Sequence, residues 1–153
     1  MPGIAEIRRL PWSAEQMFDL VADVARYGEF LPWVIATRVR SDSDEEMIAD
    51  MLVGFSAIRE KFTSRVLKHR PDRIEVIYQD GPLKDLDNRW QFRDLPEGGC
   101  EVDFSVQFSF RNALFEKIAG QYFDKAFRKM VAAFEKRAEQ LYGNSSSSAT
   151  SAA

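Results

Sequence analysis

The stretch "EVDFSVQFSF", residues 101–110, alternates apolar and polar side chains without a break. Successive side chains of a strand point to opposite sides, so its valines and phenylalanines share one face of an extended chain. The polar residues between them share the other face. This pattern predicts a strand in a sheet that is packed on one side and solvated on the other.

A long amphipathic helix is predicted directly after this strand, over residues 112–142. Apolar residues recur there at helical spacing and cover one broad side, from Leu114 to Leu141, while most charged residues fall on the other side. Arg137 is an exception on the apolar side, where its long stem could reach water. Gly143 suits the position that follows a helix end.

The first 33 residues predict one strand and two short helices. Residues 3–11 are expected to form a strand, which Pro11 stops. Ser13 and Gln16 have the spacing of a capping box, so a helix is expected to begin there. A second short helix is expected to end before Pro32, because a proline disfavours helical backbone in the residue before it.

Between these helices and residue 101, apolar residues recur at every second position, as in strands. Alternating segments are separated by polar or glycine-containing turns at 41–46, 69–73 and 96–99. Short turns imply hairpins and therefore an antiparallel sheet. We expect an α+β fold of the helix-grip type, in which one long C-terminal helix and two short helices pack on a curved sheet of about seven strands.

The chain is expected to form a single domain over residues 1–143, followed by a disordered serine- and alanine-rich tail over 144–153. A net charge of −3 argues against a nucleic-acid binder, so no DNA partner is expected. The N-terminal stretch has no apolar segment typical of a secretory signal, and a single cysteine suits a reducing compartment. These features predict a cytoplasmic protein, or one that is peripheral at the inner face of the membrane.

Residues that could carry catalysis are sparse. His69 stands in a charged turn, and Cys100 begins a strand without a cationic neighbour that would lower its pKa. The acidic segment 42–50 lacks the glycine and the ligand spacing of a calcium loop. Nucleophile-elbow, phosphate-loop and paired-cysteine motifs are absent from the sequence. We therefore expect no catalytic residues, no metal site and no enzymatic activity.

The apolar faces of sheet and helix leave two interpretations open. Ala119 and Ala126 lie near the middle of the helix face, between larger residues, so the space beneath them could be an apolar cavity. The simpler alternative is a filled core in which alanine acts as a spacer. The facing residues from sheet and helix are Met51, Trp90, Phe92, Phe104, Val106, Phe108, Tyr122, Phe123, Met130 and Phe134.

Two further stretches place apolar residues where a bend is expected. "YGEFLPWV", residues 27–34, brings Phe30, Leu31 and Trp33 around Pro32, and "DGPLKDLDNRW", residues 80–90, is expected to be a loop that exposes Leu83 and Leu86. Such residues could form the mouth of a cavity or touch a membrane or partner. Alternatively, the first stretch plugs one end of the core.

The chain resembles the coenzyme Q-binding branch of the START-domain, helix-grip superfamily. The resemblance rests on "YGEFLPWV", "GPLKDLDNRWQF" and "MVAAFEKRAEQLYG", which occur in the family's order, and it runs from Ile4 to Gly143. The family usually reads Y-x-x-F-L-P-W-C, whereas Val34 stands here at the cysteine position.

The resemblance implies a deep apolar tunnel that holds ubiquinone or a related prenylquinone as bound ligand and chaperones it for respiration or quinone biosynthesis, with transient membrane contact. The ligand-contacting residues would be Phe30, Leu31, Trp33, Met51, Leu83, Asn88, Trp90, Phe92, Phe104, Val106, Phe108, Ile118, Tyr122, Phe123 and Met130. Among them, Asn88, Trp90 and Tyr122 are the candidate hydrogen-bond donors to the quinone carbonyls.

Bacterial relatives implied by the same resemblance include a ribosome-association toxin. Under this alternative the partner is a ribosomal subunit, and the sequence support is Lys125, Arg128, Lys129 and Lys136 on the last helix. A second alternative is a polyketide cyclase or aromatase-like enzyme. That activity would require an acid–base pair inside the cavity, and the sequence offers no clear one.

Overall fold

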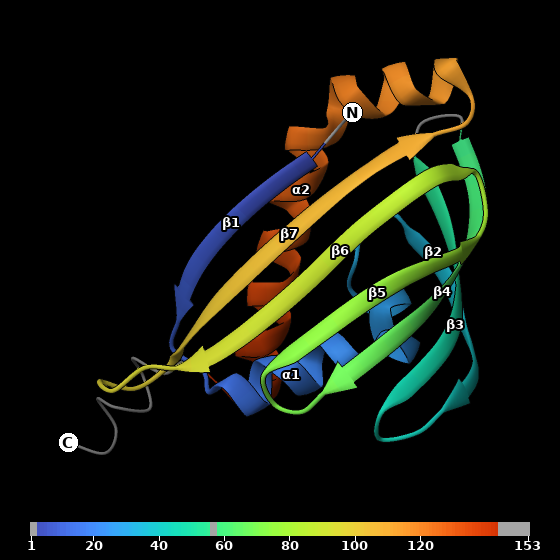
Figure 1. Cartoon of the computed structure of the whole chain (residues 1–153). Coiled ribbons are helices and arrows are strands. Elements are labelled where there is room, and N and C mark those ends of the chain that lie inside the picture. The colour runs from blue at the N-terminus through green and yellow to red at the C-terminus, as the bar shows by residue number, and fades with distance from the viewer. Residues whose placement is uncertain (1–2, 56–57, 144–153) are drawn as a thin grey trace.

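The computed structural model describes residues 3–55 and 58–143, and Figure 1 shows a curved sheet with helices behind it. The expected α+β architecture is confirmed. The strands are β1 (Gly3–Leu10), β2 (Val34–Asp42), β3 (Glu46–Phe55), β4 (Ile58–His69), β5 (Arg73–Asp80), β6 (Leu83–Asp94) and β7 (Cys100–Phe110). The helices are α1 (Ala14–Ala22), the 3₁₀ helix η1 (Val24–Glu29) and α2 (Ala113–Tyr142).

Within the described residues the sheet has seven strands in the order β1-β7-β6-β5-β4-β3-β2, and the paired neighbours are antiparallel. From β2 to β7 the chain is a meander of hairpins, as the turn spacing predicts. β1 joins the far edge beside β7, because α1 and η1 carry the chain across to β2. The long helix α2 crosses the face of the sheet that is turned away from the viewer in Figure 1.

The helix starts follow the capping signals in the sequence. Ser13 Oγ accepts a hydrogen bond from the Gln16 amide (3.1 Å), and Gln16 Oε1 accepts one from the Ser13 amide (2.9 Å), so the predicted capping box is present. Asn112 caps α2 through its side-chain Oδ1, which accepts hydrogen bonds from the Leu114 and Phe115 amides. The Gly143 amide donates to the Glu139 carbonyl at the other end of α2 (2.8 Å).

Packing is dense at the end of the sheet where α1 and the C-terminal half of α2 meet. The alternation predicted for β7 is confirmed there, since Cys100, Val102 and Phe104 are buried. Ala138 of α2 is fully buried, which lets the helix approach closely. The remaining members of this cluster include Trp12, Met17, Phe18, Val21, Ile74, Phe92 and Phe134.

The two ends of α2 are anchored to different parts of the molecule. At its C-terminal end, Tyr142 Oη donates to the Gln16 carbonyl (3.0 Å), and Trp12 Nε1 donates to the Gly143 carbonyl (2.8 Å). At its N-terminal end, Glu116 accepts a hydrogen bond from the Phe110 amide (2.6 Å). The middle of the helix therefore spans the sheet between two fixed points.

Some sequence expectations are wrong in detail. Residues 80–90 are not a loop, because β6 already begins at Leu83, which is paired with Phe110 and buried. Leu114 and Leu141 are 61% and 50% exposed, so the apolar side of α2 is narrower than expected. The expected tail, 144–153, lies outside the described residues.

Candidate functional site

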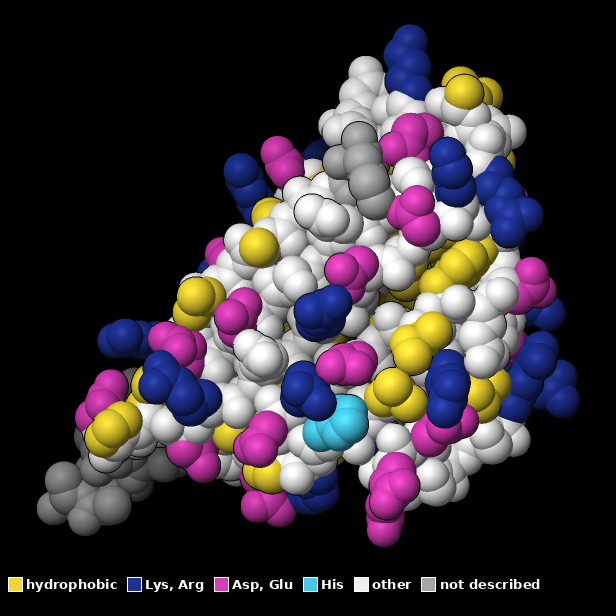
Figure 2. All heavy atoms as spheres, in the orientation of Figure 1, with side chains coloured by type: hydrophobic (Ala, Val, Ile, Leu, Met, Phe, Trp, Pro, Cys, Tyr) yellow, Lys and Arg dark blue, Asp and Glu magenta, His cyan; other side chains and the backbone are white. Residues whose placement is uncertain are grey.

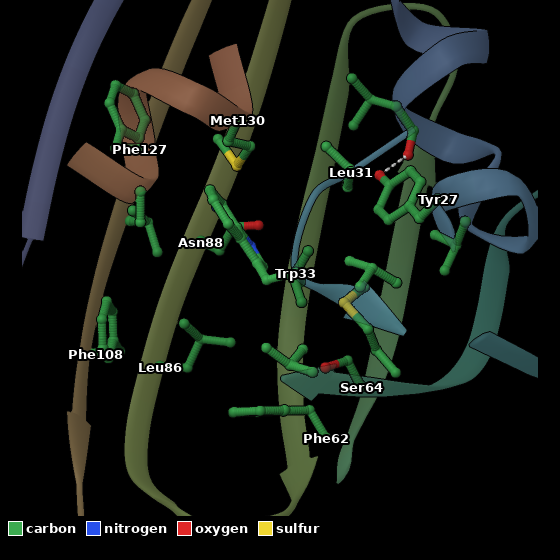
Figure 3. A pocket seen from close by; sticks show the side chains of 18 of the residues that line it. Tyr27, Leu31, Trp33, Phe62, Ser64, Leu86, Asn88, Phe108, Phe127 and Met130 are labelled. Carbon is green, nitrogen blue, oxygen red and sulfur yellow. Dashed lines mark hydrogen bonds between the residues drawn. The ribbon is translucent and has the colours of Figure 1, made fainter. Parts of the chain in front are cut away.

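An apolar cavity of about 390 Å³ lies between the sheet and the middle of α2. Its volume falls within the range of small-molecule sites. Side chains from β4, β6, β7, α2 and the segment that follows η1 face this common space (Figure 3). The molecule is thus filled at the α1 end and hollow beneath the centre of α2, which decides between the two interpretations of the core.

Small residues opposite aromatic walls keep this space open. Ala119 and Ala126 line the cavity from α2, and Ala49 and Ser64 line it from β3 and β4. The large rings pack against one another in pairs, one within the sheet and two between β7 and α2. Their centroids are 4.4 Å apart for Trp90–Phe104, 5.4 Å for Phe104–Phe127 and 5.2 Å for Phe108–Phe123.

Asn88 provides the main polar group of the lining. Its Nδ2 donates to the Ser105 carbonyl (3.0 Å), and its Oδ1 accepts from Trp90 Nε1 (3.2 Å). These two bonds fix the side-chain amide beside the Trp90 ring. An amide nitrogen carries two hydrogens, so one donor remains for a guest molecule in addition to the bond to Ser105.

Tyr27 and Ser64 add hydroxyl groups to the cavity lining. Tyr27 Oη donates to the Val21 carbonyl, and burial raises the pKa of this phenol far above its ordinary value, so it stays neutral. Among the described lining residues there is no Asp, Glu, His, Lys or Arg. The cavity therefore offers a guest apolar surface and a few neutral polar groups.

Most of the residues expected to contact a ligand come together in this cavity. They are Leu31, Trp33, Met51, Leu83, Asn88, Trp90, Phe104, Val106, Phe108, Phe123 and Met130. Within "YGEFLPWV", Tyr27, Leu31, Trp33 and Val34 line the cavity, while Pro32 is exposed at the turn. Whether this stretch gates an entrance stays a prediction.

Four expected residues lie outside the lining. Tyr122 is 46% exposed, because Phe123 and Phe127 set the inward face of α2 and Tyr122 points away from it. Phe92 is buried in the filled core against Phe18 (5.9 Å between centroids).

Of the other two, Phe30 is partly buried against the core. Phe30 packs edge-on against Phe134, with the Arg137 guanidinium over its ring (5.2 Å). Arg137 also pairs with Glu29 (2.7 Å), so its charge is neutralised near its apolar neighbours. Ile118 is half-buried on α2.

Several lining residues were missing from the sequence-based set. Phe62, Val76 and Phe110 line the cavity from β4, β5 and β7. Alternation in the sequence could have identified two of them. Phe62 shares a face with Ser64 and Val66, and Phe110 continues the alternation that starts at Val102. The sequence pattern alone does not say how far along each strand the hollow extends.

The other candidate groups lie away from the cavity. His69 is exposed at the end of β4. Cys100 is fully buried, and burial raises the pKa of its thiol to about 11, with a smaller contribution from Asp94. Within residues 3–55 and 58–143, acidic, histidine and cysteine side chains form no cluster that could hold a metal ion.

Comparison with known proteins identifies the family. Residues 10–135 match the family described as polyketide cyclase / dehydrase and lipid transport. The chain belongs to this family. The START-like fold expected from the sequence is shown as well: the chain superposes on a START superfamily protein from Mycobacterium smegmatis with a TM-score of 0.76 at 14% identity, covering 91% of this chain and 98% of that one.

Two curated relatives are closer in sequence. The ribosome association toxin RatA of Pseudomonas aeruginosa is 38% identical over 134 residues, which cover 88% of this chain and 93% of that protein. The mitochondrial coenzyme Q-binding protein COQ10 homolog B of Xenopus laevis is 34% identical over 143 residues, which cover 91% of this chain and 59% of that protein.

None of the helices in the described part of the chain is long and apolar enough to cross a membrane.

Proposed function

We propose that this protein binds a prenylquinone, ubiquinone or a close analogue, and shields it from water without transforming it. The observation that carries the proposal is the apolar cavity under α2, with Asn88 as a neutral hydrogen-bond donor in its wall. The relative named for coenzyme Q binding supports the choice of ligand.

The physical driving force is burial of isoprenoid carbon. Each buried methylene group contributes about 0.8 kcal/mol, before the entropic costs of association. The affinity should therefore rise with the number of isoprene units until the cavity is full. Transfer of such a cargo requires transient contact with a membrane, which is part of the proposal.

The test uses the small residues that keep the cavity open. Ala126→Phe places a ring in the cavity, whereas Ala132→Phe makes the same change on an exposed position of the same helix. Titration with ubiquinone-2 is followed by quenching of Trp33 and Trp90, both in the cavity wall. We expect Ala126→Phe to weaken binding at least tenfold, equivalent to about 1.4 kcal/mol, and Ala132→Phe to leave it unchanged.

Circular dichroism melting of both variants shows whether the fold survives, because overpacking can cost about 1–3 kcal/mol. Saturable quenching that is equal in both folded variants would place the quinone outside the cavity and contradict the proposal. Absence of saturable quenching in the unmodified protein would contradict it outright.

A second function is favoured by a separate observation. The side chains of Lys117, Lys125, Arg128, Lys129 and Lys136 are exposed along α2 in a chain of net charge −3. A basic helix face suits contact with RNA phosphates, and relatives are named as ribosome association toxins.

Sucrose-gradient profiles test this second function. If the protein acts on ribosomes, overexpression raises the free-subunit peaks, and charge reversal at Arg128 and Lys129 abolishes the effect. Unchanged profiles on overexpression of the unmodified chain would remove this function.

A cyclase-like activity is the second alternative to quinone binding, since the family description includes cyclases and dehydrases. General acid–base chemistry needs a titratable pair within hydrogen-bond reach of the substrate. The neutral character of the described lining supports a binding role instead.

A further inference from the structure

The sheet is incompletely paired between β5 and β6. These two strands pair from Arg73 with Gln91 as far as Ile77 with Asp87, and the pairing stops there. Beyond that point β5 continues beside β4, with Tyr78 opposite Ser64, and β6 continues beside β7, with Leu86 opposite Phe108.

The strand pairings on either side of β5 and β6 each contain a register shift beyond this point. In the β4–β5 pairing the shift lies between Thr63 and Ser64, and in the β6–β7 pairing it lies between Leu83 and Asp85. Such bulges bend a strand locally and change its direction. The two strands therefore separate in the middle of the sheet and meet again only at the Gly81–Pro82 turn. There the Tyr78 hydroxyl accepts a hydrogen bond from the Leu83 amide (2.9 Å) and closes the far end of the opening.

A hollow lies over this opening on the outer face of the sheet. Its walls include Val76, Leu86 and Asn88, and these same residues line the apolar cavity on the inner side. Figure 2 shows hydrophobic side chains at the bottom of this hollow, seen from the outer face. The cavity and the outer hollow thus share three lining residues at the end of this ladder. Val76 pairs with Asn88 within it, and Leu86 lies just beyond the last pair, Ile77 with Asp87.

The rim of the hollow carries charges of both signs. Arg89 pairs with Asp87 (3.2 Å), and Lys84 is followed by Asp85. Glu75 pairs with Arg73 (3.1 Å). A phosphate group binds best to clustered cations, whereas three acidic and two basic residues line this hollow, which suits a neutral polar group better than a phosphate.

We propose that the opening between β5 and β6 is a window through which the polar end of the bound ligand reaches water, and that Asn88 binds a neutral, carbonyl-bearing headgroup there. This assignment rests on the proposed function and adds to it the orientation of the ligand and the class of headgroup. The headgroup lies at Val76, Leu86 and Asn88, and the apolar tail extends under α2.

Cysteine accessibility tests the window without any ligand. Leu86→Cys and Val76→Cys place a thiol at the shared lining from either strand. Val106→Cys places one in the cavity lining on β7, opposite Asn88 and outside the residues that line the hollow. The native Cys100 is fully buried and serves as an unreactive background. A positively charged, water-soluble methanethiosulfonate should label the two window thiols at least about tenfold faster than Val106→Cys, because reaction follows exposure. Equal rates at all three positions would overturn the window.

Ligand protection then tests the headgroup assignment. Ubiquinone-2 should slow labelling of Leu86→Cys, whereas squalene, a hydrocarbon without a carbonyl, should leave that thiol reactive when bound to the same extent. Replacement of Asn88 by Leu should weaken ubiquinone-2 binding about three- to tenfold and leave squalene binding unchanged, as expected for loss of one hydrogen bond.

The possible failures are distinguishable. If ubiquinone-2 quenches the tryptophans saturably but does not protect Leu86→Cys, the quinone is bound and the headgroup assignment is overturned. If the window thiols react fast but no quinone binds, the window stands, while the proposed function and the headgroup assignment fall together.

Discussion

Asp50 is a buried carboxylate on the outer face of the sheet, and its neighbours hold it in the charged form. Thr63 Oγ1 donates to Asp50 Oδ1 (2.6 Å), and Arg40 Nε donates to Asp50 Oδ2 (2.8 Å). The Thr63 hydrogen bond, followed by Arg40, lowers the pKa of Asp50 below its ordinary value. A lowered pKa in the folded state contributes stability that is present above the unfolded pKa and is lost as pH falls through the folded pKa.

Thr63→Val should therefore reduce the free energy of unfolding at pH 7 by about 1 kcal/mol, since it removes one hydrogen bond to a buried group. It should also shift acid unfolding to higher pH, because the pKa of Asp50 rises. Urea unfolding at pH 7 and at successively lower pH measures both effects, and Thr63→Ser, which keeps the hydroxyl, is the matched control. If Thr63→Val unfolded at the same acidic pH as the unmodified protein, this role of Asp50 would be contradicted.

Cys100 should be inert in the folded protein. Burial raises the pKa of its thiol to about 11, and the thiolate is the reactive form. At pH 8 we expect a chromogenic disulfide reagent to react with this thiol only after denaturant is added. Reaction of the native protein at the rate of a free thiol would show that the β7 end of the core opens readily.

At the scale of elements, α2 bridges the cavity and carries a glycine in its N-terminal half. A methyl group added at Gly120 would meet no atom within 4 Å apart from the helix itself. Glycine inside a helix costs about 0.5–1 kcal/mol relative to alanine. Gly120→Ala should therefore raise Tm by about 1–4 °C in a chain of this size. A fall in Tm on calorimetry would mean that α2 requires the freedom of glycine at this position.

Elements were predictable from the sequence where one local signal decides them. The capping box at Ser13 and Gln16, the alternation from Val102 to Phe110 and the helical spacing after Asn112 each belong to a single element. The start of β6 was not predictable in this way. Gly81 and Pro82 indicate a break, but only the pairing of Leu83 with Phe110 makes the following residues a strand.

The candidate site was predictable in composition and less so in geometry. Helical periodicity placed Phe123 and Met130 in the cavity, but it did not exclude Tyr122, whose direction depends on how α2 rotates against the sheet. The opening between β5 and β6 left no sequence signal, because it results from which neighbour each strand pairs with beyond Ile77 and Asp87.

At the scale of the whole molecule, the packing explains why the cavity stays open. A filled core near α1 fixes the curvature of the sheet, and α2 is held at both ends, so the space between them stays open instead of collapsing. The resulting hollow has apolar walls and a neutral polar group at Asn88. Such a space suits a molecule with a long apolar tail and a small uncharged head.

The most direct test of this account is native mass spectrometry of the protein freshly purified from a host that makes ubiquinone, with the released ligand identified in a lipid extract. We expect a species heavier than the bare chain by the mass of one prenylquinone, and we expect Ala126→Phe to lack it while Ala132→Phe retains it. A protein that runs at the mass of the bare chain, and stays so after incubation with ubiquinone-loaded vesicles, would contradict the central claim that the cavity holds a prenylated guest.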